Sequence, residues 1–182
     1  STAEVHGIFS VSPSFAVIDP GQTHKFDITF SPHKAKTYST NAASLSVSST
    51  SYLGANVTTS GTQTYTGATE LNANVIITTT NNNVSFGSTI DSDGTTRDLT
   101  FNTGSGTVSV TSNVGAGAAL GTVTLTQTGG TTFSGTFAAA TATLTDTADA
   151  ADITFSGSAT ITTLNTTSQA YNLVFNGSSN TI

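Results

Sequence analysis

The stretch Thr131-Thr-Phe-Ser-Gly-Thr-Phe137 is one copy of a pattern that recurs through the C-terminal two-thirds of the chain. Its opening strand-like triplet returns about every 20 to 24 residues. The other copies are Val84-Ser-Phe86, Val108-Ser-Val110, Ile153-Thr-Phe155 and Leu173-Val-Phe175. Val84-Ser-Phe86, Val108-Ser-Val110 and Ile153-Thr-Phe155 place a small polar residue between two apolar ones, which is the period of a β-strand with one buried face.

Two further short segments separate the copies of this triplet. A second strand recurs as Val75-Ile-Ile77, Leu99-Thr-Phe101, Val123-Thr-Leu125, Ala142-Thr-Leu144 and the run Ile161-Thr-Thr-Leu164. A shorter third strand is expected at Ser88-Thr-Ile90, Gly135-Thr-Phe137 and Ala159-Thr-Ile161. Three short strands in each repeat of this length predict a parallel β-helix, in which every coil stacks on its neighbours.

The aromatic residues of the first strand predict the interior of that stack. Phe86, Phe133, Phe155 and Phe175 take the same place in their copies, so we expect them to form one inward column. Burial of each ring would contribute about 2 to 3 kcal/mol, at roughly 25 cal/mol per Å² of apolar area.

The first third of the chain has a different pattern, and we expect a domain boundary near residue 60. Phe9-Ser-Val-Ser-Pro13 and Lys25-Phe-Asp-Ile-Thr-Phe30 read as strands, with Ile18-Asp-Pro-Gly21 as a turn between them. Phe26, Ile28 and Phe30 would lie on one buried face. The expected division is residues 1–60 for this part and 61–182 for the repeats, all-β throughout.

The first part also resembles a known family. Val17-Ile-Asp-Pro-Gly21, Phe26-Asp-Ile-Thr-Phe-Ser-Pro32, Tyr38 and Leu45-Ser-Val47 are similar to the second half of the immunoglobulin-like ASPM/SPD-2/hydin and choice-of-anchor family. The resemblance implies a partial immunoglobulin-like sandwich over about residues 9–60. The opening strands of that family have no counterpart, and Val57 to Gly61 fits its last strand loosely.

The repeats resemble those of filamentous-haemagglutinin-like and autotransporter-type bacterial surface proteins. The similarity is carried by Gly61-Thr-Gln-Thr-Tyr-Thr-Gly67 and by steps such as Phe86-Gly87 and Phe155-Ser-Gly157. It implies right-handed coils, export across a bacterial envelope and an adhesive or scaffolding role. No ligand-binding residue carries over, because the matched motif is structural.

Composition argues against several classes of function. The 182 residues contain 4 Lys+Arg against 10 Asp+Glu, so no basic stripe is present to bind nucleic acid. Cys is absent, which excludes disulfides and thiolate metal sites. We find no apolar run of membrane-spanning length and expect no membrane insertion. The Thr/Ser/Asn-rich composition favours an extracellular or cell-surface location, in a bacterium according to the resemblance.

Two acidic clusters are the candidates for a metal site. Asp91-Ser-Asp93-Gly94 with Asp98 has carboxylates on alternate residues, as calcium loops do, but it lacks the third alternating ligand and the distant Glu of an EF-hand. Asp146, Asp149 and Asp152 form the second cluster. A solvated turn is the favoured interpretation of both, so we predict no metal and no cofactor, with calcium as the alternative.

An enzyme is not expected. His6, His24 and His33 show no metal or triad spacing, and the repeats contain one Arg, Arg97, and no Lys. Enzymes that act on polysaccharides line their clefts with basic and aromatic residues, so paired carboxylates alone make a weak case. We predict no catalytic residues.

Outward threonines suggest a binding face as an alternative. Thr124/Thr126, Thr143/Thr145 and Thr160/Thr162 occupy similar places in successive coils, and ranks of this kind can order water for ice binding or face a glycan. Thr is also a favoured outward residue on any strand, and Thr100/Asn102 interrupts the rank. Sequons at Asn56, Asn83, Asn165 and Asn176 matter only in a source that glycosylates.

The sequence therefore predicts a non-enzymatic structural or adhesive surface segment, or a filament subunit. Both ends interrupt their own patterns, so we expect either head-to-tail self-association or the remainder of a longer polypeptide to cover them. Glycan or another surface ligand is the remaining candidate partner.

Overall fold

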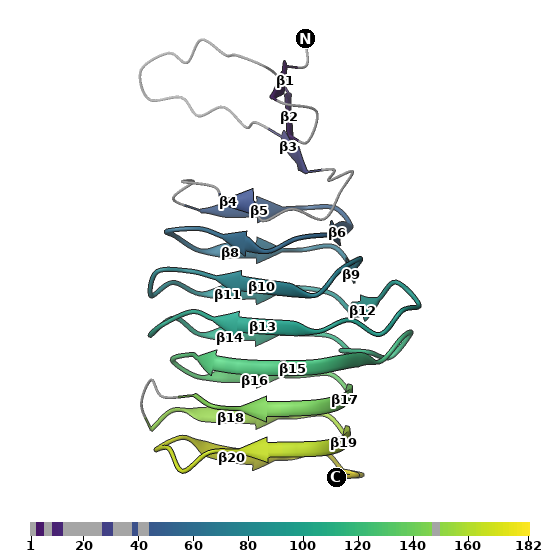
Figure 1. Ribbon diagram of the computed structural model, residues 1–182, viewed down its shortest axis with the longest axis vertical. Helices are drawn as coiled ribbons and strands as arrows, with labels where there is room; N and C mark the ends of the chain where they lie inside the picture. Colours follow the sequence, from purple (N-terminus) through teal and green to yellow (C-terminus); the bar gives the residue numbers. More distant parts are fainter. Residues whose placement is uncertain (1–2, 6–8, 13–26, 31–37, 40–43, 147–149) are drawn as a thin grey trace.

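The computed structural model describes residues 3–5, 9–12, 27–30, 38–39, 44–146 and 150–182. This part of the chain contains twenty β-strands and no helix. Most of the strands form a parallel β-solenoid of about six turns, in which each turn lies flat on the next (Figure 1). The prediction of an all-β parallel solenoid is confirmed, and its right-handedness stays a prediction.

Three parallel sheets run along the stack. The first has the order β20-β18-β16-β14-β11-β8-β5. Its strands are β5 (Leu45–Val47), β8 (Gln63–Tyr65), β11 (Val84–Phe86), β14 (Val108–Val110), β16 (Thr131–Phe133), β18 (Asp152–Phe155) and β20 (Asn172–Phe175). Val84 pairs with Val108 and Val108 with Thr131, so successive coils here span 24 and 23 residues.

The second sheet has the order β19-β17-β15-β13-β10-β7-β4. Its strands are β4 (Tyr38–Ser39), β7 (Val57–Thr58), β10 (Val75–Thr78), β13 (Leu99–Asn102), β15 (Leu120–Gln127), β17 (Phe137–Leu144) and β19 (Ala159–Thr166). The third sheet joins β6 (Ser51–Leu53), β9 (Thr69–Leu71) and β12 (Ile90–Ser92). Single bridges through Val114 continue it to the start of β17.

The strand pairing between coils confirms the sequence alignment of the repeats for the first strand but not for the last copies of the other two. The copies expected for the first strand pair with one another in the expected register. The last copies of the other strands are shifted. In the second strand, Ala142 pairs with Leu164, where the alignment had placed Ile161. In the third strand, Phe137 pairs with Ala159, where the alignment had again placed Ile161. The alternating run Ala-Thr-Ile-Thr-Thr-Leu presents an apolar residue in several frames, so sequence alone did not fix the frame.

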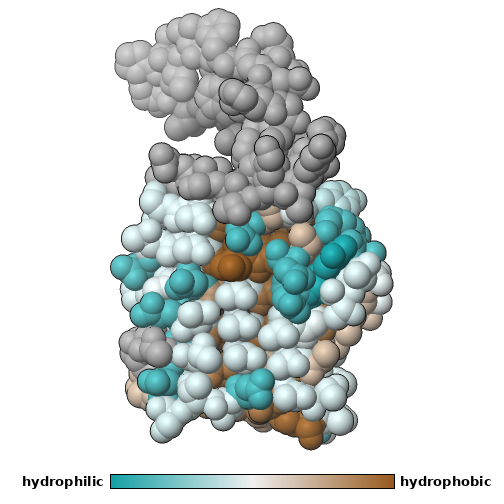
Figure 2. Space-filling model, in the orientation of Figure 1, coloured by the Kyte–Doolittle hydropathy of each residue, from teal (hydrophilic) through white to brown (hydrophobic). Residues whose placement is uncertain are grey.

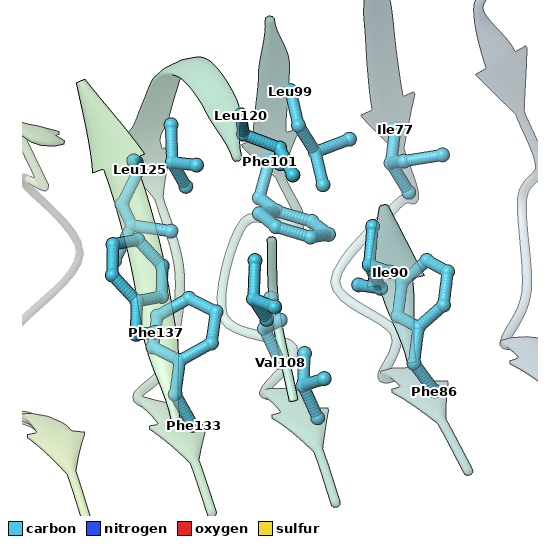
Figure 3. Close-up of a cluster of buried hydrophobic side chains, with 14 of the residues drawn as sticks. Ile77, Phe86, Ile90, Leu99, Phe101, Val108, Leu120, Leu125, Phe133 and Phe137 are labelled. Carbon is cyan, nitrogen blue, oxygen red and sulfur yellow. The ribbon is translucent and has the colours of Figure 1, made fainter. Parts of the chain in front are cut away.

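Inward side chains from the three sheets form one continuous core (Figure 3). Phe86, Phe133 and Phe155 are each 1% exposed, and Phe175 on the last strand is half-buried. The rings of Phe133 and Phe155 stack at 5.2 Å between centroids, and those of Phe155 and Phe175 at 4.9 Å. Val110 interrupts the column between Phe86 and Phe133, and Tyr65 extends it by stacking on Phe86 at 4.6 Å.

Glycines at the turn after the first sheet let adjacent coils approach closely. A Cβ on Gly157 would lie 2.3 Å from the carbonyl oxygen of Gly135, and one on Gly177 would lie 2.5 Å from that of Gly157. Gly67 faces the backbone of Ser49 in the same way. The Phe-x-Gly steps therefore have a steric cause, because only a residue without Cβ fits between the two backbones.

The N-terminal part forms a small antiparallel sheet in the order β1-β2-β3. Its strands are β1 (Ala3–Val5), β2 (Phe9–Ser12) and β3 (Asp27–Phe30), which includes Ile28 and Phe30 of the expected core. Phe26 and the turn Ile18–Gly21 lie outside the described residues. The described residues of this part show these three strands and no second sheet facing them, so the immunoglobulin-like sandwich stays a prediction.

The parallel stack begins before residue 60, so the assignment of Tyr38, Leu45–Val47 and Val57 to immunoglobulin-like strands needs correction. β4 pairs with β7, and β5 with β8, all in parallel. A short alternating strand looks the same in a sandwich and in a coil. In addition, Gln63 stands where the next coil has Val84, and Tyr65 stands where it has Phe86. These substitutions made the first copies of the repeat difficult to recognise in the sequence.

Candidate functional site

The largest departure from the repeat is one corner of the stack, where two loops protrude beside β12 (Figure 1). Residues 93–98 form the first loop, and residues 115–119 of the following coil form the second. The Asp91 carboxylate joins them, because it accepts hydrogen bonds from the backbone N–H groups of Gly117, at 2.7 Å, and Ala118, at 3.2 Å. The Gly121 N–H also donates to the Arg97 carbonyl oxygen, at 2.8 Å.

An ion pair shapes the first loop. The Arg97 guanidinium donates to both carboxylate oxygens of Asp93, at 3.0 and 2.7 Å. The hydrogen bonds from Arg97 hold the pKa of the Asp93 carboxyl below its usual range. Because both side chains are still partly exposed to solvent, the pair orders the loop more than it stabilises the fold.

The calcium candidates Asp91, Asp93 and Asp98 do not converge on a common point. Asp91 is bonded to the second loop and Asp93 to Arg97, while Asp98 Oδ1 accepts the Thr122 N–H at 2.7 Å. Among the described residues no group of three His, Cys, Asp or Glu side chains could hold a metal ion. Each carboxylate thus has a protein donor as its partner, and the absence of a metal stays a prediction.

The second acidic cluster is also divided. Asp146 is buried and accepts hydrogen bonds from the Thr128 N–H, at 3.0 Å, and the Thr128 hydroxyl, at 2.5 Å. Thr128 is in turn bonded to the inward Thr131 at 3.0 Å. Asp152 accepts from the Asn172 amide at 3.0 Å, and Asp149 lies outside the described residues. Asp146 therefore belongs to a buried polar corner.

The expected threonine rank is confirmed for Thr124 and Thr143, which pair with each other, but not for its third member, Thr160/Thr162. Outward residues of the second sheet pair as Thr122 with Thr141 and Thr141 with Thr163, and beside them Thr124 pairs with Thr143 and Thr143 with Asn165. Thr160 pairs with Ala138 instead, so Thr160/Thr162 is not a continuation of this array. The front of the stack is mostly near-white in Figure 2, the shade of residues of intermediate hydropathy.

A second hydroxyl column was missed in the sequence. On the outward side of the first sheet, small residues pair from coil to coil without interruption until the last position: Ser46, Thr64, Ser85, Ser109, Thr132, Thr154 and Val174. Its signal was present in the sequence as the middle residue of every first-strand triplet but the last, which has Val174 there.

Asn and Asp side chains connect neighbouring coils, which the sequence analysis also missed. Asn74 Oδ1 accepts the Asp98 N–H at 3.0 Å, and Asp98 then accepts from Thr122 in the next coil. Four more asparagines each accept a backbone N–H of the next coil, the bonds being Asn56 to Ile76, Asn81 to Ser105, Asn83 to Thr107 and Asn113 to Thr136. These residues could have been recognised in the sequence by an Asn or Asp that recurs at a spacing of one coil, as Asn74 and Asp98 do.

One polar group lies inside the core at the second coil. Gln63 is fully buried, and its amide nitrogen donates to the Thr78 carbonyl oxygen at 3.0 Å and to the Thr59 hydroxyl at 3.2 Å. The Tyr65 hydroxyl donates to Gln63 Oε1 at 2.8 Å. Burial raises the pKa of the Tyr65 hydroxyl above its usual range. All of these groups are satisfied within the protein, so they stabilise the coil and offer no free ligand.

His6, His24 and His33 are not among the described residues. Within the described part no helix is long and apolar enough to cross a membrane.

Compared with known proteins, the chain matches no family model, no curated protein and no solved structure. The two family resemblances therefore stay predictions, and the function rests on the residues themselves.

Proposed function

We propose that the chain is a non-catalytic structural segment of an extracellular or cell-surface protein of a bacterium, serving as an adhesin stalk or as a filament subunit. The observation that carries this proposal is the unbroken core from Leu53 to Ile161, which is filled along its length by side chains stacked on their counterparts in adjacent coils. A rod of this kind holds its ends apart, since each coil is fixed by two neighbours.

The inter-coil hydrogen bonds support the same proposal. Carboxylates and amides that could have served a ligand, such as those of Asp91 and Asp98, are used to hold the next coil. Coil-to-coil side-chain bonds resist separation of the stack along its axis, which is what a stalk requires.

A panel of polysaccharides incubated with the purified chain tests the absence of catalysis. We expect no cleavage product and no new reducing ends. Cleavage of one polymer that is lost in Asp91→Asn or Asp98→Asn would overturn the structural proposal, because it would place a catalytic carboxylate at the corner.

A binding role for the second sheet is the second candidate, favoured by its two adjoining threonine columns. Thr122, Thr141 and Thr163 lie beside Thr124 and Thr143 on a parallel sheet, so hydroxyls repeat about every 4.8 Å across strands and about 6.8 Å along them. Ice or a glycan with regularly spaced hydroxyls is the ligand class that fits such an array.

Thermal hysteresis and glycan pull-down separate this candidate from a passive stalk. Thr143→Tyr would disrupt the array, and Thr132→Tyr on the first sheet is its matched control. Activity lost only in Thr143→Tyr supports binding. Absence of activity in the unchanged chain leaves the stalk proposal standing.

A further inference from the structure

The first two coils of the stack differ from the later ones in their inward residues. In the first sheet, Gln63 pairs with Leu45 on one side and Val84 on the other. In the third sheet, Ser51 pairs with Thr69, and Thr69 with Ile90. Ser51 is 6% and Thr69 2% exposed, so hydroxyls occupy an interior column that is aliphatic or aromatic further along.

These two hydroxyls have no hydrogen-bond partner. Ser51 Oγ and Thr69 Oγ1 are buried and unpaired, whereas the neighbouring Gln63 amide is bonded on both sides. An unpaired buried hydroxyl loses its hydration without compensation. The contact between the first and second coils is therefore weakened where it should be strongest, in the interior.

The opposite holds further along the stack. Phe137 contacts Phe133 at 4.8 Å and Phe155 at 4.9 Å between ring centroids, and the inward Thr131 is bonded to Thr128. The stability of a stacked repeat protein is close to a sum over neighbouring interfaces. Unequal interfaces then open at different free energies.

We propose that the first coil, from β5 to β7, opens as a unit before the rest of the stack, and that the unpaired Ser51 and Thr69 hydroxyls set this order. The last strand, β20, is also half-buried, but its Phe175 ring stacks on Phe155. This inference does not depend on the proposed function. Early opening of the first coil would make the N-terminal end of the solenoid compliant and leave the rest of it rigid.

Native-state hydrogen exchange on the whole chain tests the order of opening. The amides of Leu45 and Ser51 and those of Val108 and Ser156 donate bonds of similar length, 2.8 to 2.9 Å, to the adjacent coil. A difference in protection between the two pairs thus reports opening and not bond geometry. We expect the first pair to exchange at least about tenfold faster, the ratio that 1.4 kcal/mol represents.

The double variant Ser51→Ala/Thr69→Val supplies the second test, since it removes the Ser51 hydroxyl without adding an atom and replaces the Thr69 hydroxyl by a methyl group of the same shape. We expect the protection of the Leu45 and Ser51 amide positions to rise about tenfold, with no change at Ser156. Thr131→Val is the matched control, because that inward hydroxyl has a partner, and we expect no gain from it.

Uniform protection along the unchanged chain would overturn the proposal. The proposal would also be overturned if the double variant raised the protection of the Leu45 and Ser51 amides no more than Thr131→Val does. Should the double variant fail to fold, the exchange profile of the unchanged chain still decides the order.

Discussion

Phe155 lies at the centre of the aromatic interior, between the rings of Phe133 and Phe175 and against Phe137. Phe155→Ala would leave a cavity lined by these rings, so we expect a loss of about 3 to 5 kcal/mol in the free energy of unfolding. Denaturant unfolding measures it. Thr162→Ala, on an exposed position of β19, is the control, and equal midpoints for the two variants would show that the column does not carry the stability.

Tyr65 gives the stability a dependence on alkaline pH. Its pKa is raised in the folded chain by burial, whereas an unfolded Tyr ionises near about 10. Above that pH the unfolded state binds fewer protons than the folded state, so stability is fully present below about pH 10 and falls as pH rises.

The Tyr65→Phe variant isolates this contribution from the other tyrosines. The difference in unfolding free energy between the unchanged chain and the variant should shrink by up to about 1.4 kcal/mol per pH unit above pH 10. Urea unfolding from pH 8 to 11 measures it. A constant difference across that range would contradict a buried, hydrogen-bonded Tyr65.

The turn that follows each first-sheet strand depends on close contact between coils. Gly157→Ala would force a methyl group against the Gly135 carbonyl oxygen, which lies in rigid backbone, so we expect a loss of about 1 to 3 kcal/mol. Ser156→Ala, at the exposed neighbouring position, should change little. If thermal unfolding finds the two variants equally stable, the close approach of the coils is wrong.

The two-loop corner should keep its structure without a metal. Asp91 already accepts two backbone N–H bonds, so excess chelator is expected to leave the melting temperature unchanged. Asp91→Asn retains an acceptor oxygen and should be tolerated, whereas Asp91→Ala should lower the melting temperature by leaving those donors unpaired. A chelator-induced fall that calcium reverses would instead identify Asp91, Asp93 and Asp98 as ligands.

At the scale of the whole molecule, we expect the chain to associate. Leu164, Leu173 and Phe175 pack against the core on one side and remain half-buried, so part of their apolar surface stays in contact with water. A second copy stacked head-to-tail would cover them and propagate into a filament, and so would more of the same polypeptide.

Light scattering coupled to size-exclusion chromatography, with negative-stain microscopy, distinguishes these outcomes for the 182-residue chain. Filaments support head-to-tail assembly, and non-specific aggregation supports coverage by further chain. A stable monomer at high concentration would contradict both.

The sequence by itself determined the strand content, the repeat and the inward Phe positions, because a period-two pattern repeated at nearly constant spacing is compatible with little else than stacked coils. Tertiary structure decided what depends on register between coils. In the folded chain the stack begins at Tyr38, and Thr160 lies outside the threonine columns. Asp91 and Asp98 accept hydrogen bonds from backbone N–H groups about one coil away. Those partners are distant in sequence, and local alternation is the same in several registers, so only the assembled stack could select among them.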